Sequence, residues 1–174
     1  MSLLLCPGFH EEALTQSFLQ EMGFLNAPNV LVFPTHTHPP YAGGEIYRFL
    51  QEKRSHSSQS VAVIAFSAGV VGGMRAAIQA QNAGLEINAF FALDGWGVPQ
   101  LGNFPLYRLS HDHFTHWSSA LLGEGKEGFY ADPPVEHLQL WATPRKVRGW
   151  WEQGNGLRSL CCAADFILDR LPQT

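Results

Sequence analysis

The stretch VAVIAFSAGVVGGMRAA, residues 61–77, decides the fold of this chain. Its first six residues are apolar and favour a β-strand, whereas the small residues after Ser67 suit a closely packed helix. Small residues recur at helical spacings of three and four, namely Gly69, Gly73, Ala76 and Ala80. The stretch therefore predicts a strand, a sharp turn at Ser67 and a helix that lies very close to a sheet.

Short apolar runs alternate with helical patterns on both sides of this stretch. Apolar runs typical of strands occupy residues 2–9, 29–34, 87–95 and 104–112, and amphipathic segments typical of helices occupy residues 10–23 and 45–53. Such alternation indicates parallel strands joined by crossover helices. We therefore predict a single α/β domain over residues 1–174, with a doubly wound, mostly parallel sheet of about six strands and helices on both faces.

The pattern weakens beyond Pro99, and residues 128–141 carry a poor strand signal. Thr143 and Pro144 are typical N-cap and first residues of a helix. We expect that helix to turn three side chains inward, namely Val147, Trp150 and Trp151. We expect a final helix to bury one apolar face, namely Leu157, Leu160, Cys161, Ala164 and Leu168.

The composition limits the partners and the location. The chain has 11 basic and 15 acidic residues, a formal net charge of -4 and no block of like charge, which argues against nucleic acid and anionic membranes as partners. Cys6, Cys161 and Cys162 fit neither a secreted disulfide framework nor a zinc-binding pair, so we expect a reducing, cytoplasmic location. The N-terminal MSLLLCPG lacks the features of a signal peptide, and no apolar stretch is long enough to span a bilayer. The oligomeric state stays open.

The segment AFSAG, residues 65–69, carries the strongest chemical signal. It differs at one position from the G-x-S-x-G nucleophile elbow, in which a strained turn holds a serine hydroxyl above the sheet edge. Small residues at positions 65 and 69 fit because larger side chains would collide across so sharp a turn. The alternative interpretation is that Ser67 is an ordinary helix N-cap.

With this motif and this order of elements, nearly the whole chain resembles the α/β-hydrolase family, especially its small lidless lipases and cutinase-like esterases. The resemblance implies a serine hydrolase that acts on a small carboxylic ester or thioester without a cofactor. In the family, a glycine-containing turn after the first strand supplies one N–H of the oxyanion hole, and residues 3–12, LLLCPGFHEE, occupy that place. Phe9 or His10 would donate together with the N–H of Ala68. The alternative is a plain turn out of a strand.

The family order places an acid and then a histidine after the serine. Asp112 ends the run at residues 104–112, where the small lipases that this chain resembles place their acid. Asp94 lies one strand earlier and is followed by Gly95, which also suits simple strand termination. We expect Asp112 to be the acid, with Asp94 as the alternative.

The segment VEHLQLWATPRKVRGWW, residues 135–151, looks like the family's final loop and selects His137 as the base. It lacks the usual glycine before the histidine and has Pro133 and Pro134 upstream. His137 on the surface of a helix begun by Pro133 is the alternative interpretation. The expected triad is Ser67, Asp112 and His137, and His111 and His113 are the alternative bases.

Histidine pairs also raise a metal hypothesis. His36 and His38 are two residues apart, as are His111 and His113, with His116 nearby, so either pair could chelate on a strand. No glutamate or cysteine ligand stands at a diagnostic spacing, and we expect no metal site.

Aromatic residues are the candidates for the substrate pocket. Several fall at the expected carboxyl edge of the sheet and could line a pocket for an apolar acyl or alcohol group, namely Phe9, Tyr41, Trp96, Phe114 and Trp117. Covering the core is the competing role. A second function class also stays open, a catalytically inactive member of the fold that binds a small molecule or a protein partner. Ala65 in place of the first glycine of the elbow favours that alternative.

Overall fold

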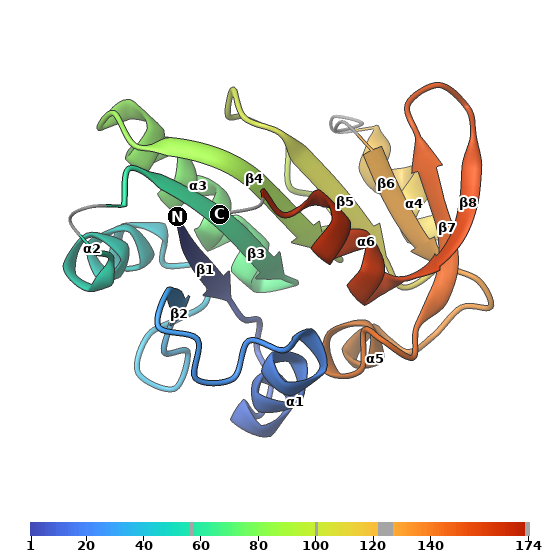
Figure 1. Cartoon of the computed structure of the whole chain (residues 1–174), viewed down its shortest axis with the longest axis horizontal. Helices are drawn as coiled ribbons and strands as arrows, with labels where there is room; N and C mark the ends of the chain where they lie inside the picture. The colour runs from blue at the N-terminus through green and yellow to red at the C-terminus, as the bar shows by residue number, and fades with distance from the viewer. Residues whose placement is uncertain (56–57, 100, 122–126, 173–174) are drawn as a thin grey trace.

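The computed structural model describes residues 1–55, 58–99, 101–121 and 127–172 and has an α/β architecture (Figure 1). Within these ranges, eight strands form one mostly parallel sheet, accompanied by six helices. The strands are β1 (Ser2–Cys6), β2 (Val30–Val32), β3 (Ser60–Phe66), β4 (Glu86–Leu93), β5 (Leu106–Ser110), β6 (Glu127–Ala131), β7 (Arg148–Gln153) and β8 (Arg158–Cys162). The helices are α1 (Glu12–Met22), α2 (Gly43–Lys53), α3 (Ala68–Asn82), α4 (His113–Ala120), α5 (His137–Ala142) and α6 (Ala163–Arg170).

The strand order is β2-β1-β3-β4-β5-β6-β7-β8. Strands β1 to β6 pair in parallel, whereas β7 and β8 are antiparallel. The chain therefore builds outward from β1 to β2 on one side and from β3 onward on the other. Carboxyl ends of the parallel strands meet at one edge, and the strand order reverses between β1 and β3, the position at which open α/β sheets usually bind ligands.

Alternate residues of β3 enter two separate cores, because successive side chains of a strand point to opposite faces. Ala62, Ile64 and Phe66 belong to the core that also holds buried residues of α1, α5 and α6. Val61 and Val63 belong to the core that holds buried residues of α2 and α3. Helices thus cover both faces of the sheet (Figure 1). This agrees with the predicted α/β class.

The prediction of about six strands was wrong, because residues 148–162 form a hairpin rather than helices. β7 pairs antiparallel with both β6 and β8, and Gly156 takes a positive φ of 82° in the turn. Trp150 and Trp151 donate in different directions, to Asp132 Oδ2 at 2.9 Å and Glu127 Oε2 at 2.7 Å. Successive side chains of a strand point to opposite faces, so two neighbouring tryptophans that donate in different directions fit a strand. The Asn155-Gly156 pair in the turn is a hairpin signal.

Only the last part of the predicted final helix is helical. α6 begins at Ala163, where Cys162 Sγ accepts from the N–H of Asp165. All three cysteines are free thiols. None of the helices in the described ranges is long and apolar enough to cross a membrane.

Candidate active site

Ser67 lies on the turn between β3 and α3 that the sequence predicts. Its backbone has φ 54° and ψ −125°, a combination that residues other than glycine rarely adopt. The turn is held by the Ser67 N–H, which donates to Leu93 O at 2.9 Å, and by Ser67 O, which accepts from Val70 N at 3.0 Å. This strained turn places a half-buried serine at the carboxyl edge of the sheet.

Glycines let the loop after β1 lie directly against the Ser67 turn. A Cβ at Gly69 would collide with the carbonyl oxygens of Cys6 and Pro7, and a Cβ at Gly8 would come within 3.0 Å of Ser67 Cβ. Larger side chains at either position would force the loop and the turn apart. The loop that carries Phe9 and His10 therefore borders Ser67.

The expected oxyanion donors differ in their surroundings. Ala68 is the first residue of α3, where a backbone N–H has no intrahelical acceptor. Phe9 is exposed, and its ring lies 6.0 Å from that of Tyr41. His10 Nδ1 contacts Glu11 O at 3.0 Å, whereas its buried Nε2 has no hydrogen-bond partner among the described residues. The Ala68 N–H and the Phe9–His10 loop are thus available beside Ser67.

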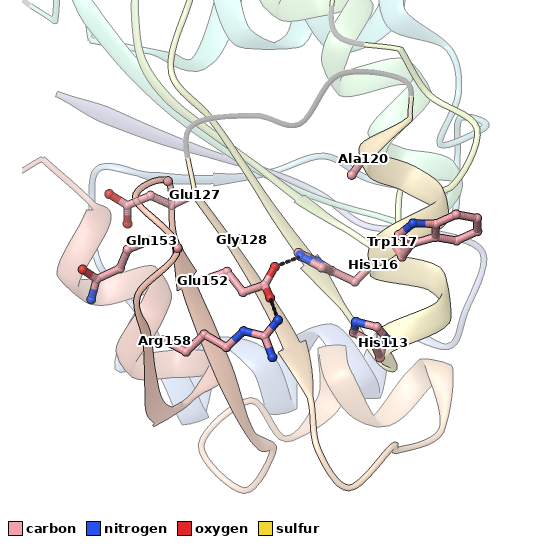
Figure 2. A pocket seen from close by; sticks show the side chains of 11 residues that line it. His113, His116, Trp117, Ala120, Glu127, Gly128, Glu152, Gln153 and Arg158 are labelled. Carbon is pink, nitrogen blue, oxygen red and sulfur yellow. Dashed lines mark hydrogen bonds and ion pairs between the residues drawn. The ribbon is translucent and has the colours of Figure 1, made fainter.

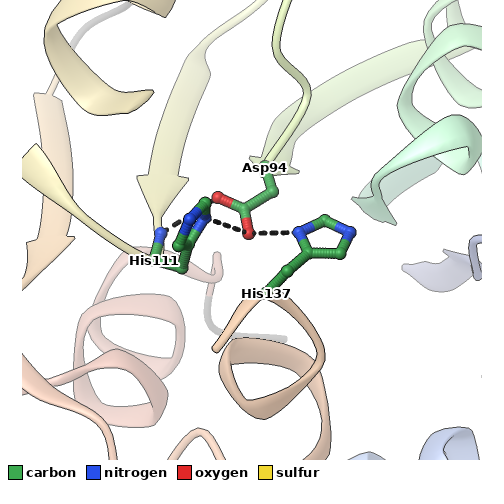
Figure 3. Close-up of side chains that lie close together, drawn as sticks. All are labelled: Asp94, His111 and His137. Atoms are coloured by element: carbon green, nitrogen blue, oxygen red, sulfur yellow. Dashed lines mark hydrogen bonds and ion pairs between the residues drawn. The ribbon is translucent and has the colours of Figure 1, made fainter. Parts of the chain in front are cut away.

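Asp94 gathers two histidines at the end of β4 (Figure 3). Its buried carboxylate accepts from the His111 backbone N–H through Oδ1 at 2.9 Å. Asp94 Oδ2 lies 2.9 Å from His111 Nδ1 and 2.8 Å from His137 Nδ1. A carboxylate can only accept, so Nδ1 of each ring carries the hydrogen. When neutral, His137 therefore keeps Nε2 as its proton-accepting atom.

His137 lies beside the residue that precedes Ser67. Its ring stacks on that of Phe66, with centroids 4.6 Å apart and an interplanar angle of 25°. The helix that it begins, α5, starts at His137 rather than at Pro133, so the alternative of a helix begun by Pro133 was wrong. The preceding loop is fixed by the Val135 N–H, which donates to His111 O at 3.0 Å.

Asp112 does not pair with His137, contrary to expectation. It is the N-cap of α4, and its Oδ1 accepts from Thr115 N at 2.6 Å. Burial pushes the pKa of Asp112 upward, but the bonds from Thr115 and the nearby His111 and His113 outweigh this, and the pKa falls below its ordinary value. His137 pairs instead with Asp94 because β4 adjoins β3 in the sheet, whereas β5 lies one strand further from Ser67.

The alternative bases also lie in different places. His111 Nδ1 contacts the Asp94 carboxylate, and His111 Nε2 is 3.6 Å from Asp112 Oδ2. His113 is exposed on α4, with its ring 4.8 Å from that of Tyr130. His111 therefore belongs to the Asp94 cluster and His113 does not. The sequence offered His111 as an alternative base, but it did not indicate that His111 and His137 would share one carboxylate oxygen.

The expected pocket aromatics are all more than half exposed and divide into two sets. Tyr41 contacts Phe9 next to the Ser67 turn. The other three gather around α4: Trp96 Nε1 donates to Ser118 Oγ at 3.1 Å, and the rings of Phe114 and Trp117 lie 6.4 Å apart. The five aromatic residues therefore do not form one continuous pocket wall. Trp117 lines a cavity that Ser67 does not line.

That cavity, of about 390 Å³, lies between α4 and the β6–β8 strands (Figure 2). His116 is buried there, and its Nε2 lies 3.1 Å from Glu152 Oε2. Glu152 Oε1 also binds Arg158 at 2.9 Å. Burial lowers the pKa of His116, with Glu152 opposing the shift. Ser67, Asp94 and His137 do not line this cavity.

The described residues bring Asp94, His111 and His137 together next to the Ser67 turn. Within the described ranges, no hydrogen bond joins Ser67 Oγ to His137 Nε2. No family model matches the chain, and no curated protein matches its sequence.

Proposed function

We propose that this protein is a serine hydrolase of the doubly wound α/β-hydrolase type that cleaves a small carboxylic ester or thioester. Ser67 is the nucleophile, His137 the general base and Asp94 the acid that orients the imidazole. Asp94 thus takes the role of the acid that the sequence had led us to expect of Asp112. The observation that carries the proposal is the 2.8 Å contact between His137 Nδ1 and Asp94 Oδ2, on a histidine stacked against the residue before Ser67.

The first half of the reaction acylates the serine. Ser67 Oγ attacks the carbonyl carbon of the substrate while its proton passes to His137 Nε2. The Ala68 N–H, with that of Phe9 or His10, stabilises the negative oxygen of the tetrahedral intermediate. When the intermediate collapses, the alcohol or thiol leaves with the proton from His137.

The second half reverses these roles with water. His137 Nε2 takes a proton from water, whose oxygen attacks the acyl carbon, and Ser67 regains its proton as the acid leaves. Asp94 stays ionised and stabilises the imidazolium in both halves. The missing hydrogen bond between Ser67 Oγ and His137 Nε2 is compatible with this route, because such bonds often tighten only when substrate binds.

The proposal is tested by covalent labelling with a fluorophosphonate probe. The native protein should be labelled on Ser67 and should hydrolyse short p-nitrophenyl esters. Ser67→Ala should do neither while keeping the circular dichroism spectrum of the native chain. The matched control is Ser159→Ala on β8, which should keep both activities.

Two outcomes would decide against the proposal. Ester turnover of Ser67→Ala equal to that of the native protein would remove Ser67 from the mechanism. If the probe labels nothing and a broad panel of esters and thioesters is not cleaved, the catalytically inactive binding protein becomes the better interpretation.

A further inference from the structure

One carboxylate oxygen serves two histidines in this site, although the proposed hydrolase needs only one. Both His111 Nδ1 and His137 Nδ1 point at Asp94 Oδ2 (Figure 3). In the described part of the chain, one ligand atom from each of these three residues lies within 4.8 Å of the others. The role of the second histidine is therefore unexplained by ester cleavage alone.

We propose that Asp94, His111 and His137 form a zinc-binding site whose occupation inhibits the enzyme, an inference whose inhibitory part rests on the proposed function. Two imidazole nitrogens and a carboxylate oxygen are ligands that Zn²⁺ prefers. At bond lengths of about 2.0–2.2 Å, tetrahedral ligand atoms lie about 3.3 Å apart. The nitrogen–oxygen distances of 2.8 and 2.9 Å thus need to widen only slightly.

The carboxylate is held in place before any ion arrives. Asp94 Oδ1 accepts from the backbone N–H of His111 at 2.9 Å, which leaves Oδ2 facing both rings. The Asp94 side chain is buried, whereas the side chains of His111 and His137 are partly exposed. An ion can therefore approach from the side of the histidines and meet a preorganised oxygen.

A second carboxylate suits the metal-bound form of His111. With zinc on Nδ1, the single hydrogen of the neutral ring sits on Nε2. Asp112 Oδ2 lies 3.6 Å from that atom, so a small ring rotation brings it within hydrogen-bond distance. A ligating histidine that donates its other N–H to a carboxylate is the usual support of a zinc site. The hydrogen bond from Thr115 N to Oδ1 fixes Asp112 for this task.

The same tautomer change explains why zinc inhibits. In the metal-free protein, the His137 hydrogen on Nδ1 leaves Nε2 free to accept the proton of Ser67. When zinc occupies Nδ1, the ring hydrogen lies on Nε2, and that atom no longer accepts a proton. Zinc also takes the oxygen of Asp94 that would stabilise the imidazolium. Serine attack therefore stops while the ion is bound.

Titration calorimetry with ZnCl₂ tests the site without reference to activity. The native protein should bind one Zn²⁺ per chain, and MgCl₂ should give no signal at this site because Mg²⁺ prefers oxygen ligands. His111→Gln and Asp94→Asn should each bind at least about tenfold more weakly, and Asp112→Asn should lose about 10-fold through its supporting contact. The double variant His36→Ala/His38→Ala, which removes the exposed pair, should bind like the native protein.

The activity measurement separates this inference from the proposed function. Zn²⁺ should abolish hydrolysis of p-nitrophenyl acetate, and EDTA should restore it. Native-like affinity in both His111→Gln and Asp94→Asn would overturn the site, and full ester turnover with zinc bound would overturn inhibition. If zinc binds as expected but the metal-free protein cleaves no ester and resists the fluorophosphonate probe, the site stands and the hydrolase proposal fails. Ester turnover by Ser67→Ala that requires zinc would make the ion catalytic and overturn its inhibitory role.

Discussion

Two histidine–carboxylate pairs in this protein have opposite arrangements. In the pair at the sheet edge, the side chain of His137 is 41% exposed and that of Asp94 is 2% exposed. In the pair beside the second cavity, the side chain of His116 is 11% exposed and that of Glu152 is 31% exposed. One pair buries the acid and presents the imidazole, and the other does the reverse.

The difference decides which imidazole is suited to proton transfer. His137 uses Nδ1 for its carboxylate, and Nε2 is left for a reactant. His116 uses Nε2 for Glu152, and its buried Nδ1 has no partner within the described ranges. Although His116 lines a cavity, Glu152 occupies its Nε2 and its Nδ1 is buried, so neither ring nitrogen is left for a reactant. We therefore assign chemistry to the first pair and a role in stability to the second.

Replacing each histidine should give the largest difference in ester turnover between the two pairs. His137→Ala should lower ester turnover by on the order of 10⁶-fold, because the serine loses its base. His116→Ala is the matched control and should keep turnover within a few-fold of the native rate. Steady-state assays with p-nitrophenyl acetate measure both. Near-native turnover of His137→Ala, with His111→Ala or His113→Ala inactive, would assign the base elsewhere.

The acid gives the next largest effect. Asp94→Asn should reduce turnover by about 10⁴-fold, because an amide cannot hold the imidazole in the required tautomer. Asp112→Asn keeps an oxygen that can cap α4 and should change turnover far less. The ratio of the two kcat values is the measurement. The reverse ranking would return the acid role to Asp112.

A stability effect should single out the His116 pair. A Cβ at Gly128 would clash with His116 Cε1, so Gly128→Ala should destabilise the protein by about 1–3 kcal/mol. In a His116→Ala background the ring is gone, and the same change should cost much less. Urea denaturation of the single and double variants measures this coupling. Equal costs in the two backgrounds would contradict the packing of His116 over Gly128.

The smallest effect concerns the pH dependence of stability. Burial lowers the pKa of His116 in the folded protein, with Glu152 opposing the shift. The unfolded chain therefore takes up a proton at this histidine near pH 6.5, and the folded chain only at lower pH. The unfolded state binds more protons there, so the free energy of unfolding should fall as pH decreases below about 6.5.

Denaturation at about pH 7.5 and about pH 5 measures that loss. His116→Gln should make the free energy of unfolding less sensitive to pH. The control His36→Ala removes an exposed histidine and should leave the pH dependence unchanged. If the free energy of unfolding depended more steeply on pH in His116→Gln than in the native protein, the pKa of His116 in the native fold would be raised rather than lowered.

Local chemistry made several features predictable from the sequence. The apolar run of β3 followed by small residues indicated the turn at Ser67, because only small residues fit against so sharp a bend. The alternating patterns of the first hundred residues indicated parallel strands with crossover helices, since each element there carries its own periodicity. His137 was selected because residues 135–151 resemble the final loop of the α/β-hydrolase family.

The C-terminal strands show where local signals failed. Thr143 and Pro144 resemble a helix start, and the tryptophans that follow suit either a helix or a strand. β7 forms because β6 offers an unpaired edge and β8 returns through a turn that contains Gly156. Pairing with a distant strand overrides local helix preference, and a single sequence does not display that pairing.

The sequence by itself determined the nucleophile candidate, the alternation of elements and the short list of acids and histidines, because these depend on residue type and local spacing. Only the tertiary structure showed that His137 contacts Asp94 and that Asp112 instead caps α4. Both end strands at the same edge, but β4 adjoins β3 and β5 does not. The convergence of His111 and His137 on one oxygen was likewise decided by strand order and by the loop tied to His111, neither of which is encoded in local periodicity.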